Sequence, residues 1–419
     1  MIRRDLIPRN LQPLLIEKME YSPVTLIHGP RQCGKTTLAQ SVAEPLGYSY
    51  FTFDDVDTRA AAQSDPMGFV SDLQDRAILD EVQLVPELFR VIKLSVDRHR
   101  VPGRFILTGS TNMLLVPGLA NALTGRMETV RLHPLSQHEI EQTQSLPFLK
   151  RLFAGDFQTR RVERLSNNLA DRIVAGGYPE ALKCPTDQSR YSWYRNYTNS
   201  LIQRDILDLS KIQWSDAIPR LLTTVANLSG QLFNIATIAS QFQMSRNTVR
   251  DYLLLLERQF LIKRLTPWYS NRIKRMVKKP KIHISDTGLA CTLLRMEPDS
   301  LLKNRGMYGQ LLESFVVQEL RRQASYSDQP YEFYHYRDRD GIEVDLVIQL
   351  GSFELAGVEV KASATVASSD FKGLRKIKVA EGDRFKFGAL LYDGEICASF
   401  GDRMYAVPIR MLWDSSWQK

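Results

Sequence analysis

Cysteine is scarce in this chain of 419 residues: Cys33, Cys184, Cys291 and Cys397 are the four, and they lie far apart. Their separation gives no zinc-ligand spacing, which excludes a cysteine-based metal site. Long apolar runs are also missing, so we expect no membrane-spanning helix and no membrane partner. The start, Met-Ile-Arg-Arg-Asp, lacks the apolar core of a secretion signal. We therefore expect a cytoplasmic protein without a disulfide framework.

What is present is the composition of an ordinary globular protein. Hydrophobic residues make up 43% and charged residues 24%, so disorder is not expected. At roughly 100–200 residues per domain, this length predicts several domains. The net charge of +8 is modest, and its distribution along the chain is more informative than its size.

The clearest motif lies near the N-terminus. Val24–His28 is a short, β-branched apolar run that predicts a buried strand, and a helix is expected from Lys35 to about Leu46. Between them, Gly29–Thr36 spells G-x-x-x-x-G-K-T. A glycine-bounded loop lets backbone N–H groups surround phosphates, and the helix start adds its positive dipole end. The pattern predicts an ATP-binding loop formed by Gly29, Pro30, Arg31, Gln32, Cys33, Gly34, Lys35, Thr36 and Thr37.

Four side chains are predicted to carry the ATP chemistry. Lys35 is expected to reach the β- and γ-phosphates, and the Thr36 hydroxyl is expected to hold Mg²⁺. A second apolar run ends in Asp80 and Glu81, 80 − 35 = 45 residues after the loop lysine. Asp80 would also hold Mg²⁺, and Glu81 would orient and deprotonate the attacking water.

Two further positions are candidates for contact with the γ-phosphate. The predicted strand Arg104–Thr108 is followed by polar residues, of which Ser110 is preferred, with Thr108 and Asn112 as rivals. Arg126 precedes another predicted strand, and its guanidinium would stabilise transition-state charge. The sequence leaves open whether Arg126 acts on its own nucleotide, on that of a neighbouring copy, or only in a surface ion pair.

These motifs together resemble a large, poorly characterised family of bacterial and archaeal AAA-type ATPases. The resemblance covers nearly the whole chain and implies a parallel sheet with an added strand between the loop strand and the Asp-Glu strand. It also implies nucleotide-dependent homo-oligomerisation and a C-terminal region of undefined function, but no known substrate. The motifs that carry it are Gly29–Thr36, Ile78–Glu81, Phe105–Ser110, Leu123–Arg126 with Pro134–Ser136, Gly176–Glu180 and Asp286–Leu289.

The middle of the chain predicts helices and then a winged helix. Residues 137–215 read as helical, with a small lid over the nucleotide in which Arg204 is a candidate sensor. Residues 216–267 follow a helix–turn–helix–strand pattern. From Ser245 to Lys281, 11 Lys/Arg and 2 Asp/Glu give a net charge of +9, which suits a phosphate backbone. The alternative is a protein-docking module. The predicted DNA-binding residues are Arg246, Asn247, Arg250, Arg272, Lys274, Arg275, Lys278 and Lys279.

The C-terminal region holds a second candidate reaction centre. A predicted helix carries Glu313, a predicted strand carries Asp345, and the next strand carries Glu359 and Lys361. Residues two apart on a strand face the same way, and 359 − 345 = 14 residues is the length of a hairpin. Three carboxylates form an oxygen site suited to Mg²⁺, beside which a lysine can position water. The elements are expected at Tyr308–Arg321, Glu343–Ile348 and Val358–Ala362.

Glu313, Asp345 and Glu359-x-Lys361 resemble the restriction-endonuclease-like, PD-(D/E)xK, nuclease superfamily. This resemblance implies Mg²⁺-dependent phosphodiester cleavage, with Lys361 as a catalytic residue. The alternative is that the acids form ion pairs in a domain that binds without cutting.

The sequence therefore predicts an α/β protein in four segments: a P-loop AAA-type core at 1–150, a helical lid at 151–215, a winged helix with a basic hairpin at 216–285, and a restriction-endonuclease-like domain at 286–419. The predicted function is Mg²⁺-dependent ATP hydrolysis coupled to DNA binding, with cleavage left open. The alternative is a non-nuclease, ATP-driven switch that docks a protein. The predicted cofactors are ATP and Mg²⁺, and the predicted partners are DNA and further copies of the chain.

Overall fold

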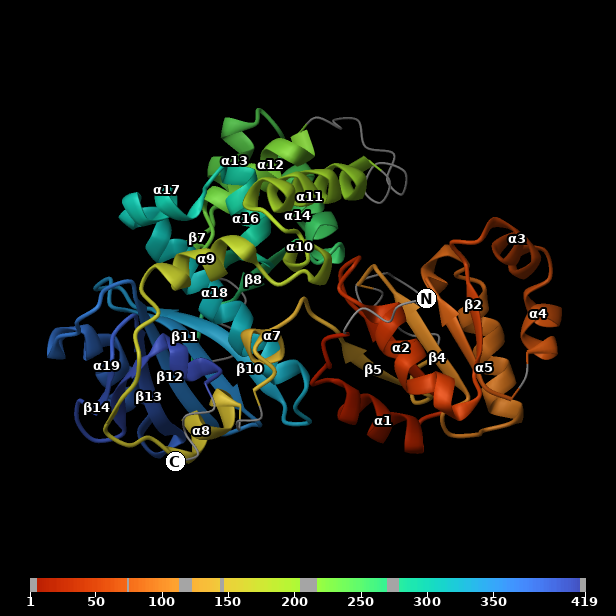
Figure 1. Ribbon diagram of the computed structural model, residues 1–419, viewed down its shortest axis with the longest axis horizontal. Coiled ribbons are helices and arrows are strands. Elements are labelled where there is room, and N and C mark those ends of the chain that lie inside the picture. The colour runs from red at the N-terminus through yellow and green to blue at the C-terminus, as the bar shows by residue number, and fades with distance from the viewer. Residues whose placement is uncertain are drawn as a thin grey trace. The chain divides into compact units, whose positions relative to one another are not determined.

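The computed structural model describes residues 6–73, 75–112, 123–143, 147–203, 217–269 and 279–414 (Figure 1). The chain divides into two compact units. The first unit is Met1–Leu135 with Glu257–Phe260 and Ser325–Asp328, and the second is Ser136–Leu256, Leu261–Ala324 and Gln329–Lys419. Within the described ranges, every helix is too short or too polar to cross a lipid bilayer. The predictions for Arg204, Arg272, Lys274, Arg275 and Lys278 lie outside the described residues.

The first unit alternates strands and helices around a five-stranded sheet. The strand order is β2-β3-β4-β1-β5, and all neighbours are parallel. Strand β4 therefore lies between the loop strand β1 and the Asp-Glu strand β3, which confirms the added strand. The elements are α1 (Gln12–Tyr21), β1 (Val24–His28), α2 (Lys35–Ala43), β2 (Ser49–Thr52), α3 (Val56–Ser64), α4 (Pro66–Asp72), β3 (Ala77–Asp80), α5 (Leu88–Arg98), β4 (Phe105–Gly109) and β5 (Met127–Arg131).

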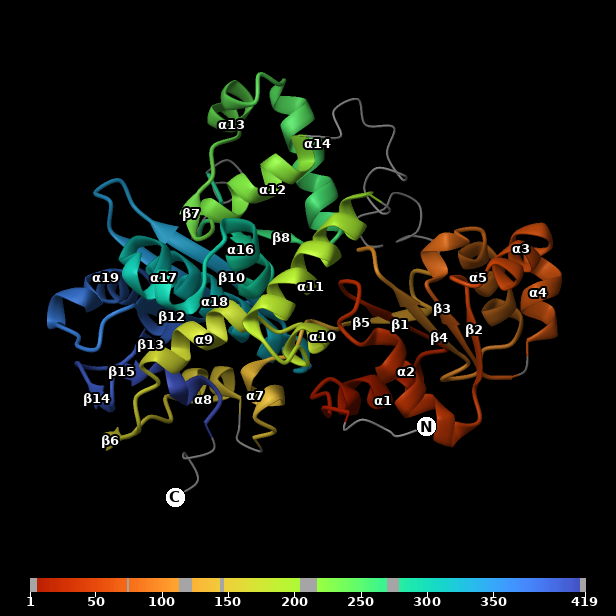
Figure 2. The same cartoon turned by 45° about the horizontal axis from the view of Figure 1, so that its top comes forward.

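Helices cover both faces of this sheet. Alternate strand residues face opposite ways, so Ile27, Ile78 and Ile106 pack against α1 and α2, whereas Leu26, Leu79 and Leu107 pack against α4 and α5. Figure 2 shows the strands between these two groups of helices. Burial on both faces explains why the strands are continuous apolar runs, and the strand predictions at Val24–His28 and Arg104–Thr108 are confirmed.

The second unit contains two sheets and most of the helices. A seven-stranded sheet has the order β10-β11-β12-β13-β15-β14-β6, and a three-stranded sheet has the order β7-β9-β8. Helix α18 carries Glu313, and the neighbouring antiparallel strands β11 and β12 carry Asp345 and Glu359. The helix and the hairpin predicted there are therefore confirmed. The strands are β6 (Arg160–Arg161), β7 (Gln231–Leu232), β8 (Ile262–Leu265), β9 (Lys281–Ile284), β10 (Tyr331–Arg337), β11 (Glu343–Leu350), β12 (Glu354–Lys361), β13 (Phe385–Tyr392), β14 (Ile396–Ser399) and β15 (Met404–Pro408).

The helices of the second unit form a core with one face of the large sheet, and α19 covers the other face. The helices are α7 (Gln137–Ile140), α8 (Phe148–Ala154), α9 (Asn167–Ala175), α10 (Pro179–Leu182), α11 (Asp187–Ser200), α12 (Ala217–Asn227), α13 (Ile235–Gln241), α14 (Arg246–Arg258), α16 (Thr287–Leu294), α17 (Pro298–Lys303), α18 (Arg305–Ser325) and α19 (Lys372–Glu381).

The compact units differ from the four predicted segments. The first unit's main segment ends at Leu135 rather than near 150, and the described part of the predicted lid belongs to the second unit. That part is not wholly helical, because Arg160–Arg161 forms strand β6 and pairs with β14 in the large sheet. The three boundaries between the predicted segments thus follow changes in sequence pattern rather than compactness.

Asp286 joins the two family motifs of the second unit. Its Oδ1 accepts hydrogen bonds from Tyr194 Oη (2.9 Å) and Gly288 N (3.0 Å). Its Oδ2 accepts from Gly177 N (2.9 Å) and Arg322 Nη2 (3.0 Å). Asp286 is 1% exposed, so these donors replace the water that a buried carboxylate would otherwise need. The Gly176–Glu180 and Asp286–Leu289 motifs therefore form one structural joint.

A matched pair of helical glycines tests this joint. A Cβ on Gly288 would lie 2.5 Å from Tyr194 Oη, whose hydroxyl is fixed by Asp286, whereas a Cβ on Gly309 meets nothing within 4 Å. We expect Gly288→Ala to destabilise the second unit by about 1–3 kcal/mol. Gly309→Ala is expected to stabilise α18 by about 1 kcal/mol. Urea unfolding followed by circular dichroism measures both, and equal effects of the two substitutions would contradict the packing argument.

Candidate functional site

The carboxyl edge of the first sheet gathers the predicted ATP residues. Strands β1, β3 and β4 end there, at His28, Asp80 and Gly109, because they are parallel neighbours. The loop after β1 needs unusual backbone angles: φ is 99° at Gly34 and 57° at Gln32. A Cβ on Gly29 would lie 2.1 Å from Leu132 O, so only glycine fits that position. Pro30, Arg31, Gln32 and Gly34 lie in this loop, and Thr37 lies in the first turn of α2.

Lys35 and Glu81 face one another across this edge. Lys35 is 4% exposed; its Nζ donates to Pro30 O (3.0 Å) and lies 4.0 Å from Glu81 Oε1. Burial acts to raise the pKa of Glu81, but the Lys35 ammonium and hydrogen bonds from Gln83 and Ser110 lower it below its ordinary value. Glu81 also has a left-handed φ of 55°, and such backbone strain clusters at functional sites. The carboxylate is thus ionised and oriented, in the protonation state that can accept a proton.

Asp80 is held by three hydroxyl groups from three elements. Its Oδ1 accepts from Thr36 Oγ1 (2.9 Å) and from the Thr108 hydroxyl, and its Oδ2 accepts from Tyr50 Oη (2.9 Å). Hydroxyl and carboxylate oxygens are the ligands that Mg²⁺ prefers. Thr36 and Asp80 therefore fit the predicted magnesium site.

The strand β4 residues connect the two acids. Thr108 donates to Asp80 and accepts from Glu81 N (3.1 Å). Gln83 Nε2 donates to Ser110 Oγ (3.1 Å) and to the Glu81 carboxylate. Ser110 thus lies beside Glu81, while Thr108, its rival, positions both acids, and the contact of Ser110 with the γ-phosphate stays a prediction. The roles of Tyr50 and Gln83 were not predicted from the sequence. A single polar side chain on a strand or in a turn gives no local pattern that indicates a contact with a distant acid.

Arg9 braces the loop from the N-terminal segment, a contact that the sequence also missed. Its Nη1 donates to Cys33 O (2.7 Å) and its Nη2 to His133 O (2.6 Å). Cys33 is buried, its Sγ donates to Leu132 O (3.5 Å), and burial raises the pKa of its thiol. Cys33 is therefore an inert packing residue within the loop.

Arg126 lies at the opposite edge of the sheet. It precedes Met127, which pairs with Val24 at the start of β1, and the five residues of β1 span about 16 Å at ~3.3 Å per residue. Its guanidinium forms an ion pair with Asp97. Arg126 therefore lies away from the loop of its own chain and forms a surface ion pair, and its action on a nucleotide stays a prediction.

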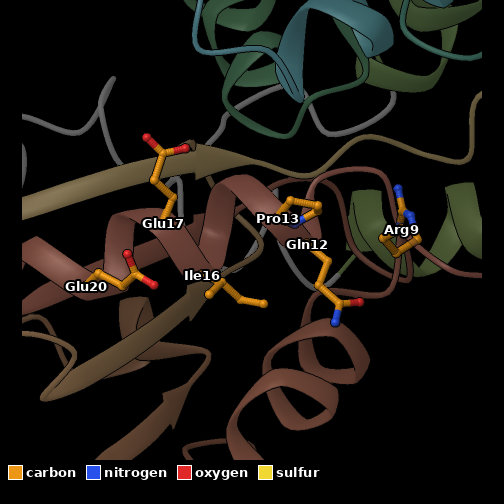
Figure 3. A pocket seen from close by; sticks show the side chains of 6 residues that line it. All are labelled: Arg9, Gln12, Pro13, Ile16, Glu17 and Glu20. Carbon is orange, nitrogen blue, oxygen red and sulfur yellow. The ribbon is translucent and has the colours of Figure 1, made fainter. Parts of the chain in front are cut away.

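A hollow of about 470 Å³ follows α1 on the first unit. Figure 3 shows Gln12, Ile16, Glu17 and Glu20 along the helix, and Arg9 at one end of the hollow. None of its lining residues belongs to the loop or to the acids of the sheet edge, although Arg9 also contacts the loop at Cys33 O.

A phosphate loop, a magnesium-competent acid and an oriented base at one sheet edge define a P-loop ATPase. A family model described as an AAA domain matches residues 21–141. Two domains of unknown function, DUF8612 and DUF4143, match residues 166–300 and 308–412. The chain is 30% identical over 409 residues to uncharacterized proteins of Mycobacterium tuberculosis and Mycobacterium bovis, covering 97% of this chain and 83% of each relative. The chain therefore belongs to the family of these AAA-domain ATPases with a C-terminal DUF4143 domain.

The AAA-domain match agrees with the AAA-type resemblance and supports ATP binding and hydrolysis. An uncharacterized protein of Haemophilus influenzae is 23% identical over 334 residues, covering 74% of this chain and 76% of the relative. Among solved structures, the Walker-type ATPase of Pyrococcus abyssi has a TM-score of 0.44 at 16% identity, covering 70% of this chain and 97% of that one. The RuvB Holliday junction branch migration motor of Thermotoga maritima has a TM-score of 0.31 at 16% identity, covering 69% and 94%. Neither structural likeness bears on function at these scores.

A second site lies within the second unit, in a hollow of about 690 Å³ that we call the acid pocket. Glu313, Asp345, Glu359 and Lys361 all line it, as predicted from their spacing. Lys361 Nζ donates to Glu359 Oε1 (3.0 Å), which confirms that the two residues face the same way. The endonuclease-like resemblance itself stays a prediction.

Lys281 is the unexpected member of the acid pocket's cluster. Its Nζ donates to Glu313 Oε1 (2.8 Å) and Asp345 Oδ1 (3.1 Å), and it is 4% exposed. Burial acts to lower the pKa of Lys281, but Asp345 and Glu313 raise it above its ordinary value, so the side chain is an ammonium. The alternation of Lys281 and His283 with Ile282 and Ile284 was the available signal, because it puts both polar side chains on one face of a strand.

The predicted DNA-contacting residues of α14 are exposed. Val249, Tyr252, Leu253 and Leu256 bury the opposite face of the helix. Arg250 Nη1 donates to Asn247 Oδ1 (3.0 Å), which holds the two side chains together near the helix start. The exposed residues are Arg246, Asn247 and Arg250 on α14, and Lys279 before β9.

Two buried threonines test the role of Thr108. Thr108 and Thr25 are both 0% exposed on neighbouring strands, but Thr25 Oγ1 has no hydrogen-bond partner in the described structure. We expect Thr108→Val to lower kcat by roughly 10-fold or more, because Asp80 and Glu81 both lose the group that positions them. Thr25→Val removes an unpaired hydroxyl and should leave kcat unchanged. Steady-state phosphate release measures both, and an equal loss in the two variants would refute the positioning role.

Proposed function

We propose that this protein is a Mg²⁺-dependent ATPase that acts on DNA. The observation that carries the chemistry is the convergence of Lys35, Thr36, Asp80 and Glu81 on one sheet edge. Thr36 and Asp80 would hold Mg²⁺, which would supply positive charge to neutralise the phosphates. Lys35 binds phosphate oxygens, and Glu81 orients the attacking water and takes its proton.

The roles of Lys35 and Glu81 separate in a kinetic test. Lys35→Ala should lose nucleotide binding, because the loop loses its cation. Glu81→Gln should retain nucleotide but lower kcat by on the order of 10²–10⁴-fold, because the base is lost. Nucleotide retention and phosphate release are measured with Mg²⁺ and with excess EDTA, which should abolish turnover. The exposed Glu87 provides the control, Glu87→Gln, for a nearby acid. Turnover by Glu81→Gln at the wild-type rate would refute the assignment.

A homo-oligomer is part of this proposal. Arg126 lies at the sheet edge opposite the loop of its own chain, so its guanidinium reaches a γ-phosphate only in another copy. Its ion pair with Asp97 leaves it partly exposed, at 30% of the side chain, which supports contact with a neighbouring molecule.

Contact with DNA is supported by the order of elements from α12 to β9. Helix, strand, two helices and two strands follow one another, and β7, β9 and β8 form an antiparallel sheet. We assign this segment as a winged helix in which α14 is the recognition helix. Arg246, Asn247 and Arg250 lie near its start, where groove-reading residues are placed.

The other end of the α14 segment belongs to the ATPase unit. Glu257–Phe260 is part of the first compact unit, where Asn112 N donates to Arg258 O (2.8 Å) and the Phe260 ring lies 5.8 Å from the His28 ring. Asn112 follows Ser110 by two residues. This continuity of chain supports coupling between DNA contact at the start of α14 and the nucleotide edge.

Phosphodiester cleavage is not included in the proposed function. The order α18, β10, β11, β12, α19, β13 supports an endonuclease-like fold for residues 305–392. However, the Lys281 ammonium contacts two of the three acids that would hold the metal. We therefore assign the second unit to binding rather than to cutting.

Arg246 and Arg250 test the DNA surface. We expect the double variant Arg246→Ala/Arg250→Ala to weaken DNA binding and to lower the salt slope by about 2, because two cations that neutralise DNA charge are lost. DNA stimulation of ATPase activity should fall in parallel. Arg195→Ala, which removes an exposed arginine from α11, is the control. Equal DNA affinity in wild type and both variants would refute this surface and favour the protein-docking alternative.

A further inference from the structure

We propose that the Lys281 ammonium takes the position of a divalent cation in the acid pocket, so that this pocket binds no metal ion. The inference rests on one observation: the acids are of a type that suits Mg²⁺, but a lysine side chain lies among them. It is independent of the function proposed for the ATPase site.

The oxygens that a metal would need are already used. Glu313 Oε1 and Asp345 Oδ1 accept from Lys281, and Asp345 Oδ2 accepts from Val360 N (3.0 Å). Glu359 Oε1 accepts from Lys361 Nζ (3.0 Å), and Glu359 Oε2 accepts from Asp345 N (3.4 Å). Five of the six carboxylate oxygens of these acids therefore have donors. Among the described residues, no group of three or more His, Cys, Asp or Glu side chains is arranged to hold a metal ion.

Lys281 is fixed at this position by its backbone. It begins β9, the middle strand of the small sheet, where it pairs with Leu232 on one side and Leu265 on the other. Two residues on, His283 Nδ1 hydrogen-bonds to Ser314 Oγ (3.0 Å), beside Glu313 on α18. The backbone of Lys281 and the side chain of His283 are thus both held beside α18, and the Lys281 side chain itself is buried against the acids.

A second buried polar group supports the same conclusion. His283 Nε2 has no hydrogen-bond partner in the described structure and lies 3.8 Å from Glu313 Oε1. An imidazole nitrogen can bind a metal ion, and His283 is 1% exposed and faces Glu313. At 3.8 Å, however, this nitrogen forms no hydrogen bond to Glu313. The positive charge beside Glu313 comes instead from Lys281 at 2.8 Å. A divalent cation bound to the same two oxygens would lie against the ammonium and be repelled by it.

The test counts bound Mn²⁺ on the full chain without nucleotide, by electron paramagnetic resonance. We expect wild type and Asp345→Asn to bind the same number of ions, because Asp345 holds a lysine. Lys281→Met keeps the apolar stem and removes the charge, and it should bind one more Mn²⁺ per chain. The double variant Lys281→Met/Asp345→Asn should return to the wild-type count.

Lys361→Met is the matched control, because Lys361 lies in the same pocket but contacts Glu359. It should add no Mn²⁺ site while Lys281 is present. The proposal is overturned if wild type binds one more ion than Asp345→Asn, or if Lys361→Met gains a site as Lys281→Met does. The comparison of wild type with Asp345→Asn decides the question even if Lys281→Met fails to fold, and Glu359→Gln replaces Asp345→Asn if that variant fails.

Discussion

The nucleotide edge depends on one buried carboxylate, that of Asp80. It accepts hydroxyl hydrogen bonds from Thr36 on α2, Tyr50 on β2 and Thr108 on β4. Strands β2 and β4 flank β3 on its two sides, so these contacts exist only in this strand order and this register. A buried carboxylate is costly without donors and tolerable with three. The position of the loop helix relative to the sheet and the geometry of the candidate catalytic acids are thus fixed together.

The second unit also contains a buried carboxylate, Asp286, which is stabilised by a charged group as well as by a hydroxyl. Asp286 is buried by accepting from Tyr194, two backbone N–H groups on its own helix, Gly177 N and the Arg322 guanidinium. Glycine is required where these groups converge, because a Cβ on Gly176 would lie 2.3 Å from Asp286 Oδ1. Two glycine-containing motifs, far apart in sequence, therefore share a structural cause and need no ligand to explain them.

The strands of the first unit could be predicted because each is a short apolar run whose polar residues come at its end. Ala77–Asp80 is an example, because its three apolar residues indicate burial on both faces and its final Asp marks the sheet edge. Lys281 could not be predicted, because its role depends on Glu313 and Asp345, which are 32 and 64 positions away. Arg160–Arg161 is a strand only because β14 offers it a partner. Both features depend on contacts between residues far apart in the sequence, which no local pattern indicates.

The two acid clusters differ in the donors that surround them, and this difference separates their chemistry. The donors to Asp80 are hydroxyl groups, which are neutral and which can rotate so that an oxygen lone pair faces a cation. The donor to Glu313 and Asp345 is an ammonium whose strand is paired on both sides, and it has no lone pair to offer a metal. A hydroxyl shell adapts to Mg²⁺, whereas a tethered ammonium competes with it. The two clusters thus differ in the charge and freedom of the groups that donate to them, neutral hydroxyls around Asp80 and an ammonium beside Glu313 and Asp345.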